Sequence, residues 1–191
     1  MSITTVGIIG AGTMGNGIAQ ACAVKGIKVV MVDISEAAVQ KGLATVSGSL
    51  DRLIKKEKIT QADKDAALAC IQTSTSYDDL KAAQLVIEAA TENYELKLKI
   101  LKQVDAIVAP EVIVASNTSS ISITRLAAAT SRADRFIGMH FFNPVPVMNL
   151  VEIIRALQTS NETEQATREL SKTFSKETST SNDVPGKQKK D

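Results

Sequence analysis

The chain has 191 residues, of which 44% are hydrophobic and 23% charged, ordinary globular values that exclude wholesale disorder and fibrous architectures. The 22 Lys and Arg nearly balance the 21 Asp and Glu, so a net charge of +1 leaves no global field to attract nucleic acid. Trp is absent, and four Phe with two Tyr do not make a stacking platform for single strands. We therefore expect no nucleic-acid partner.

The cysteines and the apolar runs indicate the compartment. Cys22 and Cys70 fall in apolar helical patterns, where reduced, buried thiols are expected rather than a disulfide or a redox pair. No apolar run approaches the roughly 18 residues of a membrane helix, and the N-terminus lacks the basic region and cleavage site of a signal peptide. One histidine cannot build a metal cluster. We expect a soluble, cytoplasmic protein without a metal or a membrane partner.

Short apolar runs recur along the chain and are typical of buried strands. They cover residues 5–9, 28–32, 85–89, 112–115 and 136–139. The runs are nearly continuous rather than alternating, as expected for strands that are covered on both faces.

Helical patterns fill the intervals between these strands. The expected helices cover residues 14–25, 36–55, 61–70, 93–108 and 161–174. Ser35 and Thr60 precede two of them as N-caps, and Thr159 with Glu162 fits a capping box before the last. The alternation of strands and helices with short connections predicts an α/β fold, with a doubly wound, mostly parallel sheet between helices.

The end of the chain differs in composition from the rest. In residues 175–191, Val184 is the only aliphatic side chain. Such a segment cannot bury enough apolar surface to offset the entropy lost on ordering. We therefore expect one domain over residues 1–174, followed by a polar, disordered tail over residues 175–191.

A glycine-rich turn joins the first strand to the first helix. Its sequence is Gly10-Ala11-Gly12-Thr13-Met14-Gly15, the pattern G-x-G-x-x-G. The first glycine permits the tight turn, the second lets a pyrophosphate approach the backbone, and the third lets helix and strand pack closely. The free N–H groups of the helix N-terminus then face the phosphates.

The second strand ends in an acidic residue, Asp33, a little over twenty residues after the first glycine. A carboxylate there accepts hydrogen bonds from the adenosine ribose hydroxyls and repels a 2′-phosphate. The alternative is a simple glycine turn with a surface aspartate, but the strand, turn, helix and acid together favour dinucleotide binding. The cofactor of this Rossmann-type domain is therefore expected to be NAD rather than NADP.

The only histidine, His140, follows the last of the apolar strands. Ligands bind at the carboxyl ends of strands in open parallel sheets, although a lone histidine at a strand end is often structural. Glu152 lies within the apolar run 150–154, and a buried carboxylate is costly unless it is paired. A His140–Glu152 dyad would suit a general base that removes a hydroxyl proton while a hydride leaves carbon.

Two further features leave alternatives open. Residues 116–120 (SNTSS) follow the fourth strand. Ser120 fits the N-cap of the next helix. Ser119 is either a structural residue of this loop or a residue that forms a hydrogen bond to a substrate oxygen. A basic cluster near the end of the second helix fits a solvated surface or a site for a phosphorylated substrate. Its members are Arg52, Lys55, Lys56 and Lys58.

The segments VGIIGAGTMGNGIAQACA, VVMVD, VIEAATEN, ASNTSSISIT and RFIGMHFFNPVPVMNLVEII occur in this order. Together they resemble the short-chain L-3-hydroxyacyl-CoA dehydrogenases, notably the bacterial members that act on 3-hydroxybutyryl-CoA. The resemblance covers residues 1–174. It implies reversible oxidation of an L-3-hydroxyacyl-CoA to the 3-oxoacyl-CoA, with NAD as the cofactor and the acyl-CoA as the partner.

The resemblance also implies roles for single residues. His140 matches the catalytic base, Glu152 its carboxylate partner, and Ser119 the serine that contacts the substrate hydroxyl. The implied cofactor contacts are Gly10, Ala11, Gly12, Thr13, Met14, Gly15, Asp33, Glu92, Lys97, Ser119 and Asn143. The implied substrate contacts are Ser49, Lys56, Ser119 and Asn143.

The sequence departs from the family at its end. Pro185-Gly186 match a family motif, but Lys190 stands where the family has an asparagine, and polar residues 177–183 replace an apolar strand. The family's all-helical C-terminal domain, through which its members dimerise, has no counterpart in the sequence. The rival interpretation is therefore a non-catalytic NAD-binding module resembling the lambda-crystallins.

Overall fold

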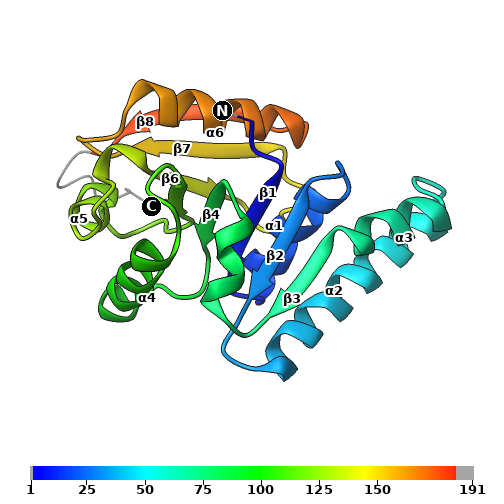
Figure 1. The fold of residues 1–191 in the computed structure, drawn as a ribbon. Helices are drawn as coiled ribbons and strands as arrows, with labels where there is room; N and C mark the ends of the chain where they lie inside the picture. The colour runs from blue at the N-terminus through cyan, green and yellow to red at the C-terminus, as the bar shows by residue number, and fades with distance from the viewer. Residues whose placement is uncertain (1, 184–191) are drawn as a thin grey trace.

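The structure is a computed structural model that describes residues 2–183. A single eight-stranded sheet has the order β3-β2-β1-β4-β5-β6-β7-β8. Only β6 and β7 are antiparallel; the other neighbouring strands are parallel (Figure 1). The strands are β1 (Thr5–Ile9), β2 (Lys28–Val32), β3 (Ile71–Ser74), β4 (Leu85–Glu88), β5 (Ile113–Ser116), β6 (Phe136–Phe141), β7 (Leu150–Arg155) and β8 (Glu177–Asn182).

Helices cover both faces of this sheet. They are α1 (Thr13–Ala23), α2 (Glu36–Lys55), α3 (Gln61–Ala69), α4 (Tyr94–Ile107), α5 (Ile123–Ala128) and α6 (Asn161–Thr173), with short 3-10 helices at Tyr77–Ala82 and Ala133–Arg135. One apolar core lies under α1, α2 and α6, and the second lies under α4 and α5. Along β1, Ile8 enters the first core and Ile9 the second, which explains why the run is continuous. The predicted doubly wound fold is confirmed.

The sheet contains three strands that the apolar runs did not predict, namely β3, β7 and β8. The edge strand β3 has the sequence IQTS, in which two of four residues are buried. The strand β7 carries Glu152 in the middle of its apolar run. From the sequence, this charge is interpreted as a catalytic partner of His140, and the run is not assigned to a strand.

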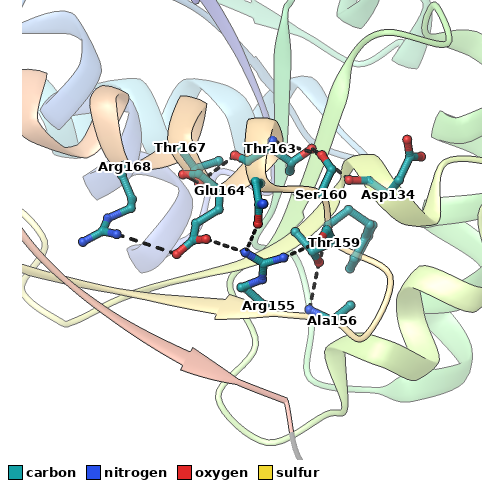
Figure 2. A network of polar contacts seen from close by, with 11 residues as sticks. Asp134, Arg155, Ala156, Thr159, Ser160, Thr163, Glu164, Thr167 and Arg168 are labelled. Atoms are coloured by element: carbon teal, nitrogen blue, oxygen red, sulfur yellow. Dashed lines mark hydrogen bonds and ion pairs between the residues drawn. The ribbon is translucent and has the colours of Figure 1, made fainter.

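The helix caps agree with the sequence at two positions and differ at a third. Ser35 and Thr60 cap α2 and α3, and Thr60 forms a complete capping box. Before α6 the cap is Ser160, not the expected box of Thr159 with Glu162. The Thr159 hydroxyl is already engaged, because it donates to Phe136 O at 2.7 Å and accepts from Ala156 N at 2.8 Å (Figure 2).

Around this cap a polar network ties α6 to the end of β7. Arg155 donates to the Glu164 carboxylate at 2.6 Å and to Thr159 O at 2.6 Å (Figure 2). The Thr163 hydroxyl donates to Asp134 O at 2.9 Å. The helix is therefore fixed over β6 and β7 by polar contacts as well as by its apolar side.

The expectation of a disordered tail from residue 175 is wrong for residues 177–182. These residues form β8, which pairs in parallel with all six residues of β7 (Figure 1). The error has a physical cause: the strand is mostly exposed, so its order comes from the backbone ladder rather than from side-chain burial. The Asp183 carboxylate then accepts from the Ser122 hydroxyl and from Thr124 N, both at 2.7 Å.

The remaining end features lie outside the described residues. These are Val184, Pro185-Gly186 and Lys190. Within residues 2–183, no helix combines the length and the apolar character needed to cross a bilayer. Both cysteines are free thiols; Cys22 is buried and Cys70 is half-buried.

Candidate functional site

The glycine turn lies where the strand order reverses, since β1 pairs with β2 on one side and with β4 on the other. Gly10 has φ +106°, and a Cβ there would lie 2.8 Å from Ala89 O. A Cβ on Gly15 would lie 1.8 Å from Gly10 O, so α1 packs directly on the turn. By contrast, a Cβ on Gly12 would meet no atom within 4 Å. Open space therefore lies above the N-terminus of α1, whose first N–H groups have no side-chain cap.

Asp33 is held at the rim of this turn. Its Oδ2 accepts from Ala11 N at 2.8 Å and its Oδ1 accepts from Ile34 N at 2.7 Å. The carboxylate lines a cavity of about 420 Å³ that also contains Gly10, Tyr77 and Lys99. Burial, and then the charges of Asp33 and Glu88, raise the pKa of Tyr77, so the phenol stays protonated at neutral pH. This cavity offers a carboxylate, a hydroxyl and apolar walls, as a nucleoside requires.

A second cavity, of about 300 Å³, lies on the other side of the turn. It is lined by Gly12, Thr13, Met14, Glu92, Lys97 and Asn117, with Glu88 and residues 89–91. Glu92 accepts from the hydroxyls of Thr118 at 2.8 Å and Ser120 at 2.9 Å, so it joins the loops after β4 and β5. Ser120 is therefore not the N-cap of α5; that cap is Ser122.

Lys97 lies at the bottom of this second cavity and is only 1% exposed. It forms an ion pair with Glu88, whose side chain is fully buried at the end of β4. The Ser116 hydroxyl donates to the same carboxylate at 2.9 Å, and Ala90 N donates to its other oxygen at 2.9 Å. Glu88 is not among the site residues predicted from the sequence, although a carboxylate within the apolar run 85–89 is a signal for a paired, buried charge.

His140 and Glu152 lie directly opposite each other on β6 and β7. Residues opposite each other in an antiparallel pair project from the same face, with Cβ atoms about 4.5–5.5 Å apart. Both side chains are half-buried, and the His140 ring lies 4.6 Å from the Phe142 ring between centroids. Asn117 supports this strand end, because its Oδ1 accepts from Phe141 N at 2.9 Å.

A third cavity, of about 630 Å³, lies between the end of α2 and the residues after β6. Ser49, Arg52, Lys56 and Lys58 line it from α2 and the following turn, and Asn143 lines it from the opposite side. Thr13 lines both this cavity and the second one. The predicted substrate residues Ser49, Lys56 and Asn143 are thus brought together beside the predicted cofactor residues.

Ser119 stands apart from the residues that line these cavities. It is exposed in the loop between Thr118 and Ser120, both of which are bound to Glu92. Its backbone position is therefore defined, and its role in substrate binding stays a prediction.

These features define a class of protein: a Rossmann-type dinucleotide-binding domain with an acid at the ribose position and a basic cavity beside it. Comparison with known proteins then gives the family. Residues 5–184 match the model of the 3-hydroxyacyl-CoA dehydrogenase, NAD binding domain, and the chain belongs to this family. The resemblance noted in the sequence is confirmed, and the cofactor of the domain is NAD.

Three relatives illustrate the similarity. The chain is 49% identical over 183 residues to a 3-hydroxybutyryl-CoA dehydrogenase of Bradyrhizobium diazoefficiens, covering 96% of this chain and 62% of the relative. It superposes on the (S)-3-hydroxybutyryl-CoA dehydrogenase of Ralstonia eutropha with a TM-score of 0.95 and 74% identity, covering 97% of this chain and 65% of that one. For the 3-hydroxybutyryl-CoA dehydrogenase of Escherichia coli, the TM-score is 0.94 and the identity 36%. The match covers 97% of this chain and 39% of that one.

Proposed function

We propose that this chain is the cofactor-binding part of an enzyme that oxidises an L-3-hydroxyacyl-CoA to the 3-oxoacyl-CoA, with 3-hydroxybutyryl-CoA as the substrate. The observation that carries the proposal is the opposition of His140 and Glu152 at the carboxyl end of β6. The names of the relatives support the substrate class. We also propose a cytoplasmic location, and dimerisation through a C-terminal domain as in the family.

The residues around the glycine turn fit NAD. The space above Gly12 accommodates the pyrophosphate against the N-terminus of α1. Asp33 accepts from the ribose hydroxyls and disfavours a 2′-phosphate. Glu92 and Lys97 contact the cofactor from the second cavity, and Asn143 reaches it from the third. When bound, NAD accepts the hydride that leaves the substrate carbon.

His140 acts as the general base in this proposal. It takes the proton of the substrate hydroxyl while the C–H bond breaks, and Glu152 orients the imidazole and stabilises its protonated form. Ser119 donates to the substrate oxygen and holds it in place. The reaction therefore needs one proton acceptor and one hydride acceptor, and the protein supplies the first.

The third cavity receives the coenzyme A part of the substrate. Ser49 and Lys56 are the proposed contacts, and Arg52 and Lys58 add positive charge to the same walls. Phosphate groups favour such a cluster of cations. The apolar residues on the opposite side, among them Val147, face the less polar part of the coenzyme.

NADH formation from 3-hydroxybutyryl-CoA tests this proposal. The sequence should be assayed joined to the C-terminal domain of a full-length relative, because the chain spans 62% of the Bradyrhizobium protein. We expect turnover in the joined protein and a reduction of about 10²–10⁴-fold in His140→Gln. NAD binding without turnover in the joined protein would instead favour the non-catalytic module.

A further inference from the structure

The loop between β6 and β7 forms one wall of the third cavity. We call residues 142–149 the β6–β7 loop; it carries Asn143 and supplies residues 143–147 to the cavity. Apart from the half-buried Phe142, Val145 is its single buried residue, at 2% exposure. A surface loop with one buried side chain needs other contacts to keep one shape.

Two of those contacts come from the loop and from α1. The N–H groups of Val147 and Met148 both donate to Pro144 O at 3.0 Å, which closes a turn. Val145 packs on α1 so tightly that a Cβ on Gly17 would lie 2.9 Å from the Val145 Cβ. These contacts fix the turn and one side chain, but they leave the carbonyl groups of Val145 and Met148 to be bound from elsewhere.

Lys176 supplies the missing donors. Its Nζ donates to Val145 O at 2.7 Å and also to Met148 O, so one ammonium group joins both ends of the turn. Next to it, Glu177 N donates to Asn149 O at 2.7 Å. The connection between α6 and β8 therefore holds the β6–β7 loop at three carbonyl groups.

The end of α6 places Lys176 under the loop. Ser175 adopts a left-handed conformation with φ +59°, and Lys176 N donates back to Ser171 O at 3.1 Å. This geometry ends a helix and reverses the chain. Lys176 consequently lies against the β6–β7 loop and is only 7% exposed.

A buried ammonium group is a costly means of filling space. Among residues 2–183, the recorded ion pairs do not include Lys176, so the charge is stabilised by carbonyl oxygens. Burial lowers the pKa of Lys176, which reflects that cost. An aliphatic side chain would fill the same volume without the penalty, but it would leave both carbonyl groups unbound. The charged residue thus provides a specific connection rather than packing alone.

We propose that Lys176 is a positioning residue for acyl-CoA binding, which fixes the β6–β7 loop so that Asn143 and its neighbours form a wall of the third cavity. The identity of the ligand rests on the proposed function. The fixing of the loop is a property of the fold and can be measured separately.

The experiment compares three variants of the 191-residue chain. Lys176→Met removes the donors and keeps the length, Lys176→Arg keeps a cation, and Lys172→Met is the control on the exposed side of α6. Coenzyme A and NAD are each titrated into every variant by calorimetry. In Lys176→Met we expect about a tenfold or greater loss of coenzyme A affinity, because two charge-assisted hydrogen bonds are lost. NAD affinity should stay within about threefold, since the glycine turn carries most of it.

Amide hydrogen exchange provides the measurement that does not depend on the ligand. Exchange at Val147 and Met148 should accelerate in Lys176→Met, remain slow in Lys172→Met, and recover at least partly in Lys176→Arg. Unchanged exchange, or an unchanged coenzyme A affinity beside faster exchange, would overturn the proposal. If the wild-type chain did not bind coenzyme A, the proposed substrate site would fail, and faster loop exchange would still decide whether Lys176 positions the loop.

Discussion

His140 and Glu152 are twelve positions apart in the sequence and face each other across the β6 and β7 ladder. This ladder is antiparallel, unlike the other pairings of the sheet. An antiparallel return strand is what allows a residue at the carboxyl end of β6 to meet one near the start of β7. The β6–β7 loop, which carries Asn143, is thereby placed beside the same pair.

Substitution of the dyad tests this arrangement in a full-length context. His140→Gln should lower turnover by about 10²–10⁴-fold, the usual effect of a positioned base, with little change in NAD affinity. Glu152→Gln should reduce turnover less and should shift the pH–rate profile, because it changes the partner of the imidazolium. Glu177→Gln, an exposed glutamate on β8, is the control. Turnover of His140→Gln within about threefold of wild type would contradict the assignment.

The buried ion pair below the second cavity should dominate local stability. Lys97→Met leaves the fully buried Glu88 carboxylate without its cation, and we expect unfolding free energy to fall by about 3–5 kcal/mol. The double variant Glu88→Gln with Lys97→Met should recover part of this loss, since no buried charge remains. Lys102→Met, an exposed lysine on the same helix, should be nearly neutral. Equal losses for Lys97→Met and Lys102→Met in chemical denaturation would contradict the account.

The left-handed residue at the end of α6 offers a stabilising change. Ser175 has φ +59°, a conformation that costs a residue with a side chain about 1–2 kcal/mol. Ser175→Gly should therefore raise the unfolding free energy by about 0.5–1 kcal/mol after the greater freedom of glycine in the unfolded chain is subtracted. Ser181→Gly, in the interior of β8, should lower it. Thermal unfolding of the two variants checks that the unfolding free energy rises in the first and falls in the second.

A further prediction concerns acid. Burial alone would raise the pKa of Asp105, but hydrogen bonds from Arg132 and Ser131 outweigh it and lower the pKa below its usual 3.8. Because the folded value is the lower one, this carboxylate stabilises the fold above pH 3.8, and the contribution disappears as the pH falls through the folded value.

Asp105→Ala should accordingly lower the unfolding free energy at pH 7 by about 1–3 kcal/mol, since Arg132 loses its carboxylate partner. The difference from wild type should shrink as the pH is lowered below 3.8. Asp51→Ala, which breaks the more exposed pair with Lys64, should cost less than about 1 kcal/mol. A difference for Asp105→Ala that stays constant from pH 7 to strong acid would refute the assignment.

The sequence predicted those parts of the fold whose order comes from burial. The strands around Ile8 and Ile87 are apolar on both faces, so the sequence alone predicts them. The edge strands β3 and β8 were missed because backbone pairing, which has no side-chain signature, holds them. The polar side chains of the tail predict disorder, but residues 177–182 pair with β7 and complete the sheet.

The same distinction applies to the site. Gly10 and Asp33 belong to a spaced pattern with a direct chemical meaning, so they were found from the sequence. The partners of Lys97 and Lys176 depend on which elements and loops the fold brings together, and those contacts span 9 to 31 positions. Such long-range polar contacts require the structure.

The choice of cofactor tests most directly whether the glycine turn and Asp33 form an NAD site. NAD and NADP should be titrated by calorimetry into the wild-type chain, into Asp33→Ala, and into Asp65→Ala as an exposed control. The wild type should bind NAD at least about tenfold more tightly than NADP, because the Asp33 carboxylate meets the 2′-phosphate with like charge. Asp33→Ala should weaken NAD binding and bring the affinities for NAD and NADP close to each other. Asp65→Ala should change neither affinity. Equal affinities of the wild type for the two cofactors would contradict the claim that this turn and its acid form an NAD site.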